Sequence, residues 1–285
     1  MSGLAILILV FAAFIHAVWN LLAKRSIDSV LFGFLSCLVS ALIYIPLATF
    51  VVTTQPVDWN ATTVGALAIS ALLQLVGFNC ILLSYKIGDY SVMYPVQRGT
   101  GPLVATLAAI IFLAERPSIG ALAGIALILI GVFIIGGGGA ILKSKSLKPI
   151  AFGCLTGVAI AAVTVWSKYC LSVLNIPFVL IDYAGVLGVA LVLTPYALKN
   201  HDKLKREWQD NQSAIIGVGV LRSLAYMSIL FVLTTVPVYY VAPLREMSIL
   251  FAALIGAKLL KEGQVKRRFS AVLVMFVGLI CLSLN

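Results

Sequence analysis

The sequence predicts an all-α integral membrane protein in which ten transmembrane helices form two inverted five-helix repeats around a central cavity. Hydrophobic residues occupy 62% of its 285 positions, and only 11% of the positions are charged. Soluble domains are about half apolar and about one quarter charged. The apolar residues form separate stretches of membrane-spanning length, and the second half of the chain repeats features of the first. These observations predict a polytopic membrane protein without a second, soluble domain.

Ten apolar stretches are candidates for membrane spans, because a helix needs about 20 mostly apolar residues to cross the hydrocarbon core. Most connections between them are very short, so consecutive helices are expected to be antiparallel neighbours. The longer connections are 143–148, 199–212, which contains His201 in a loop, and 261–268. The expected spans are 3–23, 30–52, 62–86, 90–114, 118–139, 149–171, 177–198, 213–235, 239–260 and 268–284.

Lysine and arginine gather in the odd-numbered connections, and the other side of the membrane holds little beyond Arg116. Basic loops face the cytoplasm, so we expect a cell (inner) membrane protein with both termini outside. The net charge of +10 would also suit a nucleic-acid partner. Short basic loops between spans are instead typical of contact with anionic lipid. These basic residues are Lys24, Arg25, Lys86, Lys143, Lys145, Lys148, Lys199, Lys203, Lys205, Arg206, Lys261, Lys266, Arg267 and Arg268.

The five cysteines all lie in apolar stretches and form no Cys-x-x-Cys pair. A buried free cysteine behaves as a small hydrophobe, so we expect no disulfide, metal or other cofactor. The first span is expected to be a retained helix rather than a signal peptide, because it continues through the polar stretch 16–20.

A repeat of 147 residues relates the two halves of the chain. One copy contains five spans, an odd number, so the two copies must enter the membrane in opposite orientations. Inverted repeats are a recurrent transporter design, with the site at the repeat interface near the midplane. We expect repeats at 1–142 and 149–285, joined by the basic linker 143–148. The offset takes Trp19 to Trp166, Arg98 to Arg245, Glu115 to Glu262 and Gly131 to Gly278.

Three motifs occur in the order expected of one transporter family. They are Ala114-Glu115-Arg116 before the fifth span, its counterpart Lys261-Glu262-Gly263, and His16-Ala-Val-Trp19-Asn20 followed by Lys24-Arg25. With the inverted repeats, the whole chain resembles the EamA-type members of the drug/metabolite transporter superfamily. The resemblance implies secondary transport of small organic metabolites, commonly export of amino acids, through a cavity lined by spans 1, 3, 4, 6, 8 and 9. Family members are often drawn with cytoplasmic termini, opposite to what the loop charges here indicate.

Two arginines lie about two turns inside their spans, Arg98 in the fourth and Arg245 in the ninth. A charge inside a span is costly, so it is expected to be functional or paired. Two guanidiniums facing one cavity would bind a carboxylate or phosphonate in a bidentate manner. The alternative is a structural partner for each, such as Glu246 beside Arg245. Glu246 itself could bind a coupling proton or be held ionised by an arginine.

His16 and Asn20 are four residues apart in the first span and share one face with Trp19 close by. We expect this polar stripe to face the protein interior, where His16 could shuttle protons or serve packing alone. Trp166 repeats Trp19 in the second half. The two indoles could sandwich a flat or cationic substrate or anchor the chain at the membrane interface.

Further polar residues within the spans complete the candidate substrate site. Amides are ordinary interhelical hydrogen bonders in membrane proteins, and Arg222 could instead snorkel to the interface. Asp182, near the start of the seventh span, is expected to serve a helix end or the lipid interface. The set consists of Gln74 and Asn79 in the third span, Tyr94 and Gln97 in the fourth, Arg222 and Tyr226 in the eighth, and Tyr239 and Tyr240 in the ninth.

Glycines in the fifth span suit close helix packing. Gly124 and Gly131 are seven residues apart on one face, and the last span carries Gly278. We expect these two spans to pack together, with a homodimer seam as the alternative. The run Gly136–Gly139 resembles no nucleotide-binding loop, because no Gly-Lys-Ser/Thr follows it.

The sequence favours a secondary active transporter, an exporter or exchanger, for a small anionic or zwitterionic metabolite such as an amino acid. A proton or an exchanged substrate would supply the energy, because no ATP-binding motif is present. A multidrug efflux pump would need more interior acids, and a flippase for lipid-linked precursors would use the same arginines on a phosphate. A membrane-embedded enzyme would need acid pairs or histidine clusters. The expected partners are the metabolite and the bilayer, with the protein a monomer or homodimer.

Overall fold

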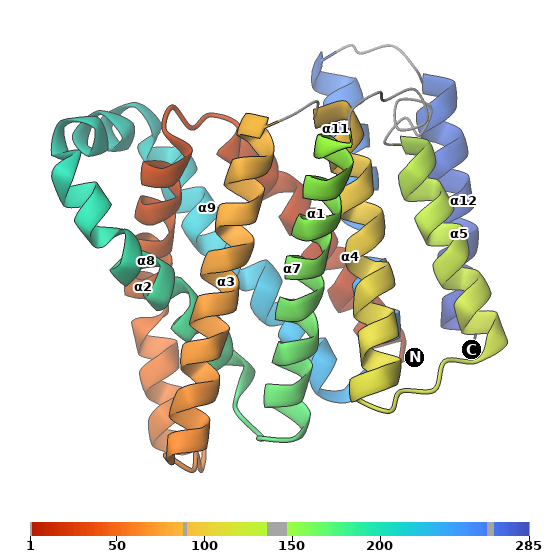
Figure 1. Cartoon of the computed structure of the whole chain (residues 1–285), viewed down its shortest axis with the longest axis horizontal. Coiled ribbons are helices and arrows are strands. Elements are labelled where there is room, and N and C mark those ends of the chain that lie inside the picture. The colour runs from red at the N-terminus through yellow and green to blue at the C-terminus, as the bar shows by residue number, and fades with distance from the viewer. Residues whose placement is uncertain (1, 88–89, 136–146, 261–264, 285) are drawn as a thin grey trace.

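The computed structural model describes residues 2–87, 90–135, 147–260 and 265–284, which form helices and contain no β-strand. Figure 1 shows the helices standing side by side, with short connections at the two ends of the bundle. The helices of the first half are α1 (Gly3–Ala23), α2 (Ser29–Thr54), α3 (Ala61–Ile87), α4 (Tyr90–Phe112) and α5 (Ile119–Ile135). Those of the second half are α7 (Lys148–Ser172), α8 (Phe178–Lys199), α9 (His201–Thr235), α10 (Val238–Arg245), α11 (Met247–Leu260) and α12 (Val265–Ser283).

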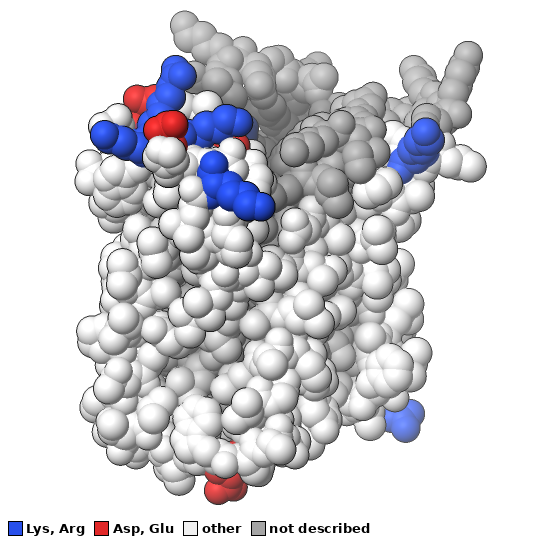
Figure 2. Space-filling view, turned by 60° about the vertical axis from the view of Figure 1, so that its left-hand side comes forward, with Lys and Arg blue, Asp and Glu red and all other residues white. Residues whose placement is uncertain are grey.

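The surface between the two ends of the bundle is apolar. Six of the described helices, α1, α2, α3, α7, α8 and α9, are long and apolar enough to cross a membrane. Large side chains such as Leu7, Phe50 and Leu191 are exposed on them, and the middle of the face in Figure 2 carries almost no charge. An apolar belt of this kind is suited to lipid, and it confirms the prediction of a multi-pass membrane protein.

Charge is distributed unevenly between the two ends. Lys and Arg gather at one end of the face shown in Figure 2, where the α1–α2 and α8–α9 connections place residues such as Lys24, Arg25 and Lys199. α1 begins and α12 ends toward the opposite end (Figure 1). The separation of basic loops from the termini therefore agrees with the sequence pattern.

The connection 199–212 is helical, which corrects the prediction that His201 lies in a loop. α9 starts at His201 and continues into the predicted eighth span, with irregular backbone at Asn211 (φ −127°, ψ 17°). Leu204 and Trp208, four residues apart, pack on the cluster around α2 and α9. The amphipathic spacing of this stretch gives it a helical surface to bury, so it does not remain a loop.

Glu207 fixes this extra helical segment to the α1–α2 connection. Its side chain is 1% exposed and accepts hydrogen bonds from the backbone N–H groups of Ile27 (3.2 Å) and Asp28 (2.7 Å) and from the amide of Asn211 (2.8 Å). These donors compensate the burial of its carboxylate.

The predicted ninth span is divided into α10 and α11. Glu246 lies between them, and its N–H donates to the carbonyl of Pro243 at 3.0 Å, a tight i to i−3 turn. Pro243, inside the last turn of α10, lacks an N–H and so removes one α-helical hydrogen bond just before this break. Non-helical backbone at membrane depth is tolerated where protein covers it, and Glu246 is 5% exposed.

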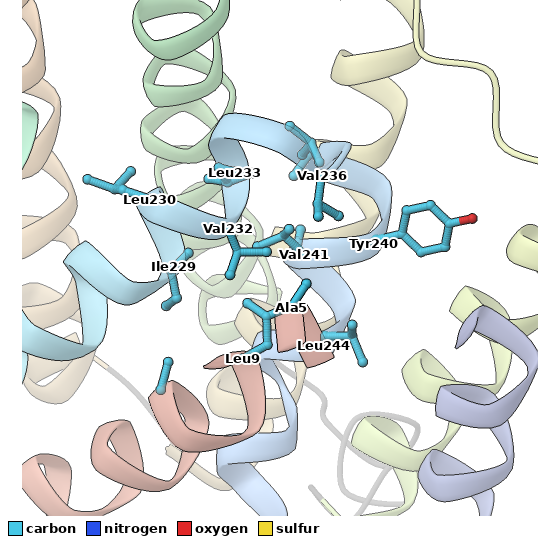
Figure 3. Close-up of a cluster of buried hydrophobic side chains, with 14 of the residues drawn as sticks. Ala5, Leu9, Ile229, Leu230, Val232, Leu233, Val236, Tyr240, Val241 and Leu244 are labelled. Carbon is cyan, nitrogen blue, oxygen red and sulfur yellow. The ribbon is translucent and has the colours of Figure 1, made fainter. Parts of the chain in front are cut away.

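Helices of the two halves pack against each other rather than forming separate units. α1 contacts α9, α10 and α11, whereas α4 contacts α7 and α10, and α2 and α3 both contact α8. The largest core cluster includes side chains of α1, α9 and α10, among them Leu9, Val232 and Leu244 (Figure 3). Residues of both halves therefore pack together in one core cluster.

Packing of α5 against α12 confirms the prediction from the glycine spacing. A Cβ atom at Gly124 would lie 2.8 Å from the carbonyl oxygen of Gly278. A Cβ atom at Gly131 would overlap Met275. The glycine face of α5 is thus occupied within the chain, which is the packing expected over the homodimer seam.

Candidate functional site

An ion pair joins the two repeats at the break between α10 and α11. Nη1 of Arg98 lies 3.2 Å from Oε2 of Glu246. The Arg98 side chain is 15% exposed and that of Glu246 is 7% exposed. α4 brings the arginine from the first repeat, and the turn after α10 brings the carboxylate from the second. Glu246 thus pairs with the arginine of the other repeat rather than with its neighbour Arg245.

Arg245 belongs to the same group of charges. Its Nη1 donates to the hydroxyl of Thr164 in α7 at 3.0 Å, and it interacts electrostatically with Glu246, Arg98 and Tyr226. The two arginines that the repeat relates therefore both interact with one carboxylate, Arg98 by an ion pair and Arg245 electrostatically.

Of the polar stripe on α1, His16 joins this group. It interacts electrostatically with Arg98, Arg222 and Arg245. Trp19 packs edge-on against its ring with centroids 4.8 Å apart. The amide of Asn20 donates to the backbone carbonyl of His16 at 2.8 Å, so this amide satisfies its own helix.

Arg222 lies inside the bundle, so the snorkelling alternative is wrong. Its guanidinium donates to Oε1 of Gln74 in α3 at 3.0 Å and to the sulfur of Cys37 in α2 at 3.4 Å. It interacts electrostatically with Asp182 and Tyr226. Arg222 lies near the middle of α9 (His201–Thr235) rather than near an end of the helix.

Asp182 is buried, 2% exposed, which corrects the expectation that it serves a helix end or the lipid interface. α8 starts only four residues earlier, at Phe178, but it packs against α2, α3 and α9. The early turns of α8 are therefore covered by protein. Asp182 is a second carboxylate inside the spans, besides Glu246.

Tyr226 connects these groups. Its hydroxyl lies 3.0 Å from that of Ser167 in α7, and it interacts electrostatically with Arg245, Asp182 and Arg222. We call the set His16, Arg98, Asp182, Arg222, Tyr226, Arg245 and Glu246 the central polar cluster. With His16 neutral, its three arginines and two carboxylates leave a net charge of +1, which suits an anionic group.

Other predicted site residues lie apart from this cluster. The indole N–H of Trp166 donates to Ser70 at 3.1 Å, which ties α7 to α3. Asn79 is exposed, and its amide donates to the carbonyl of Leu75 at 2.9 Å. It was expected to line the cavity, but an amide that bonds to its own helix can face lipid.

Two aromatic residues and one amide of the predicted set lie on the helices that bear the arginines. Tyr239 is buried at the start of α10, its ring centroid 4.4 Å from that of Tyr240. Gln97 is 7% exposed, and its backbone carbonyl oxygen faces Gly157 of α7. The side chain of Tyr94 lies outside the described residues.

Glu115 and Lys168 hold the corner between α9 and α10. The carboxylate of Glu115 accepts from the backbone N–H groups of Val238 (2.8 Å) and Tyr239 (3.2 Å). The ammonium of Lys168 donates to the carbonyl of Leu233 at 2.7 Å. These bonds satisfy free donors and acceptors at the facing helix ends. A cavity of about 480 Å³ lies beside this corner, lined in part by both charged residues. Glu262, which repeats Glu115, lies outside the described residues.

No group of three or more His, Cys, Asp and Glu side chains that could hold a metal ion occurs in the described ranges. Among the described residues, the direct contact within the central polar cluster is the Arg98–Glu246 ion pair. Its other hydrogen bonds join the cluster to neighbouring side chains, among them Gln74, Thr164 and Ser167.

The profile of the EamA-like transporter family matches this chain twice, over residues 3–137 and 147–284. No curated protein matches it in sequence. A crystal structure described only as that of a protein aligns with 100% of this chain and 99% of its own, with a TM-score of 0.81 and 13% sequence identity. At that identity the likeness shows the fold alone. The two matches of the profile cover both halves, and so the chain is a two-repeat membrane protein that belongs to the EamA-like transporter family of the drug/metabolite transporter superfamily.

Proposed function

We propose that this protein is a secondary active transporter, an exporter or exchanger, of a small anionic or zwitterionic organic metabolite such as an amino acid. It works by alternating access at the interface between the repeats. The observation that carries this proposal is the 3.2 Å ion pair between Arg98 of the first repeat and Glu246 of the second, with Arg245 beside it.

A substrate carboxylate would compete with Glu246 for Arg98. A guanidinium can hold a carboxylate through two parallel hydrogen bonds, and Arg245 offers a second one. Breaking a buried ion pair without replacement is strongly unfavourable, so the substrate must take over the bond to Arg98. Glu246, once released, can accept the ammonium group of an amino acid, which explains why a zwitterion would suit this site.

The same exchange explains how binding could drive movement. The Arg98–Glu246 pair ties α4 to the junction of α10 and α11. A ligand that takes over Arg98 removes a bond between the repeats and replaces it with bonds to itself. Ligands shift a conformational equilibrium only through such differential contacts. Loss of the tie is therefore the proposed trigger for rocking of one repeat against the other.

The proposed membrane arrangement has ten spans, with α10 and α11 together forming the ninth. The basic end of the bundle lies in the cytoplasm and both termini lie outside, because basic loops are retained on the cytoplasmic side. In the cell membrane, the halves 1–142 and 149–285 rock around a cavity that contains Arg98 and Arg245.

Counterflow in proteoliposomes tests the function. We expect unlabelled acid inside the vesicles to drive uptake of labelled L-glutamate, L-alanine or lactate. Arg98→Ala and Arg245→Ala should each abolish it, because removing a bidentate guanidinium from a charged partner costs about 2–5 kcal/mol. Arg206→Ala, a change at an arginine whose side chain is 78% exposed, is the matched control and should keep the wild-type rate.

Two results would contradict the proposal. Arg98→Ala protein that elutes as a folded, monodisperse species and still exchanges these acids would show that the arginine is structural. Uptake of cationic dyes in place of the acids, unaffected by both substitutions, would favour multidrug efflux.

A further inference from the structure

Asp182 is a buried carboxyl group that the structure leaves only partly compensated. Among the described residues its Oδ1 atom has no hydrogen-bond partner, and no cation lies within 4.0 Å of it. Arg222 acts on it electrostatically but directs its guanidinium to Gln74 and Cys37. Glu246 differs, because it has a direct partner in Arg98 at 3.2 Å.

Two further buried polar atoms beside Asp182 also lack partners among the described residues. They are Nε2 of Gln74 and the hydroxyl of Ser223. Ser223 interacts with the carboxyl group, although the two form no hydrogen bond of ordinary geometry. Gly185 lies three residues after Asp182 on the same face of α8, and a Cβ atom there would overlap the Gln74 amide. Buried polar atoms without partners are rare, and a group of them needs an explanation.

The charged and titratable groups that act on Asp182 come from two of the helices packed against α8. Arg222 and Tyr226 lie on α9, and Cys37 and Tyr44 lie on α2. α3 contributes the neutral amide of Gln74. Over the described residues no second carboxylate acts on Asp182, so its protonation is governed by burial and by Arg222.

This environment suits a proton as the missing ligand. A carboxylate removed from water is costly to keep charged unless it is paired. Protonation would remove that charge and would turn a carboxyl oxygen into a donor for a neighbouring acceptor. A metal cation fits poorly, because Arg222 would repel it and the described residues contain no group of metal-ligating side chains around it.

We propose that Asp182 is the coupling-proton site of this transporter, and that a proton bound there strengthens binding of an anionic substrate between Arg98 and Arg245. The proposal rests on the proposed function. Protonation of Asp182 would raise the net charge of the central polar cluster from +1 to +2. Tyr226 interacts electrostatically with Asp182, Arg222 and Arg245, so it lies within the electrostatic reach of both the proton site and the substrate site.

Linkage makes this coupling reciprocal. If a proton strengthens substrate binding, then substrate binding must draw a proton from solution to the same extent. The carboxylate of Asp182 takes up the proton from water on the side to which the transporter is open, and releases it on the other side. Substrate and proton then travel in the same direction, so export occurs when the outward gradient of the substrate exceeds the inward gradient of protons.

Counterflow at two pH values, each equal on both sides of the vesicle, tests the site. L-glutamate, L-alanine and lactate are suitable probes, because their carboxylates stay ionised from about pH 6 to about pH 8. We expect the half-saturating concentration for wild-type protein to be about tenfold lower at the lower pH, within the usual range of coupling between sites. Asp182→Asn should bring this ratio to about one. Asp58→Asn, a change in an exposed connection, should leave it as in the wild type.

Other outcomes would overturn the proposal. Wild-type counterflow that is independent of pH would leave the proposed function standing and remove the proton site. Persistence of the pH dependence in Asp182→Asn, together with its loss in His16→Gln, would assign the proton to the histidine. Failure of the wild-type protein to exchange any of the three acids would instead count against the proposed function.

A measurement on wild-type protein covers the case in which Asp182→Asn does not fold. When the probe is added to purified transporter in weakly buffered detergent solution, the transporter should take up protons from the solution. An indicator dye would follow this uptake. Uptake should approach one proton per transporter, and Asp182→Glu should preserve it. Absence of proton uptake on saturating binding would refute the coupling.

Discussion

The two seams between the repeats are related by the 147-residue offset but are built differently. In the seam of α4 against α7, which we call the glycine seam, the backbones touch. A Cβ atom at Gly157 would lie 2.7 Å from Cβ of Thr100 and 3.0 Å from the carbonyl oxygen of Gln97. In the seam of α1 against α10, the apolar seam, the residue equivalent to Gly157 is Val10. There Ala5 and Leu9 of α1 pack beside α10, as Figure 3 shows.

The difference shows that an inverted repeat can keep its topology while the residues that pack its helices together change. α4 and α7 both begin near the basic end of the bundle, whereas α1 and α10 both begin near the opposite end (Figure 1). The helices of the two seams therefore begin at different ends of the bundle. The glycine seam is close because Gly157 has no side chain, whereas the apolar seam is filled by apolar side chains such as Leu9. The two seams need not contribute equally to the stability of the protein.

Leu9→Ala should produce the largest loss of stability and would break the apolar seam. Leu9 is 2% exposed, and truncation of a buried leucine costs about 2–5 kcal/mol through lost contacts and a residual cavity. Unfolding in detergent would measure the change. Thr156→Ala, at the equivalent position of α7, is the control and should cost less, because its hydroxyl bonds only to its own helix at Phe152. Equal losses would mean that the seams do not differ in this way.

Gly157→Leu should break the glycine seam at a cost of about 1–3 kcal/mol from overpacking. Because the new side chain must separate α4 from α7, thiol reagents should modify Cys154, whose sulfur lies 3.8 Å from the Thr100 hydroxyl, faster than in the wild type. The matched change Val10→Leu in the apolar seam should be tolerated. Unchanged labelling of Cys154 in folded Gly157→Leu protein would contradict backbone contact as the basis of this seam.

Glu115→Ala should have the smallest effect and would sharpen the comparison at the start of α10. Loss of a side-chain acceptor at a helix N-terminus costs about 0.5–2 kcal/mol. The expected result is faster amide hydrogen exchange at Val238 and Tyr239, whose N–H groups bond to this carboxylate. Glu115→Gln keeps one acceptor and should lie between the two. Protection of both amides in Glu115→Ala would show that another group caps α10.

The sequence was sufficient for the repeat, both arginines of the offset and the packing of α5 on α12, because each depends on residue type and spacing. Rotation of a helix about its axis is not encoded so directly. Asp182 was expected at a helix end or the lipid interface but is buried. Asn79 was expected to line the cavity but is exposed.

The hydroxyl residues that bind the site could not be recognised from the sequence. Thr164 binds Arg245 at 3.0 Å, yet its hydroxyl also donates to its own helix at Ile160. Ser167 likewise bonds to Val163 of its own helix as well as to Tyr226. Since most serines and threonines in membrane helices make the local bond, these two could not be singled out. The partner of Glu246 was similarly hidden, because it lies 148 residues away in the chain.

The bonds of Glu115 also bear on the order in which the protein is made. Its carboxylate accepts hydrogen bonds from N–H groups of α10 that lie more than a hundred residues later in the chain. During synthesis the first repeat leaves the ribosome before Val238 does. The acceptor for the first turn of α10 is thus already synthesised when that turn leaves the ribosome, so the last bonds of this corner wait for the second half of the chain.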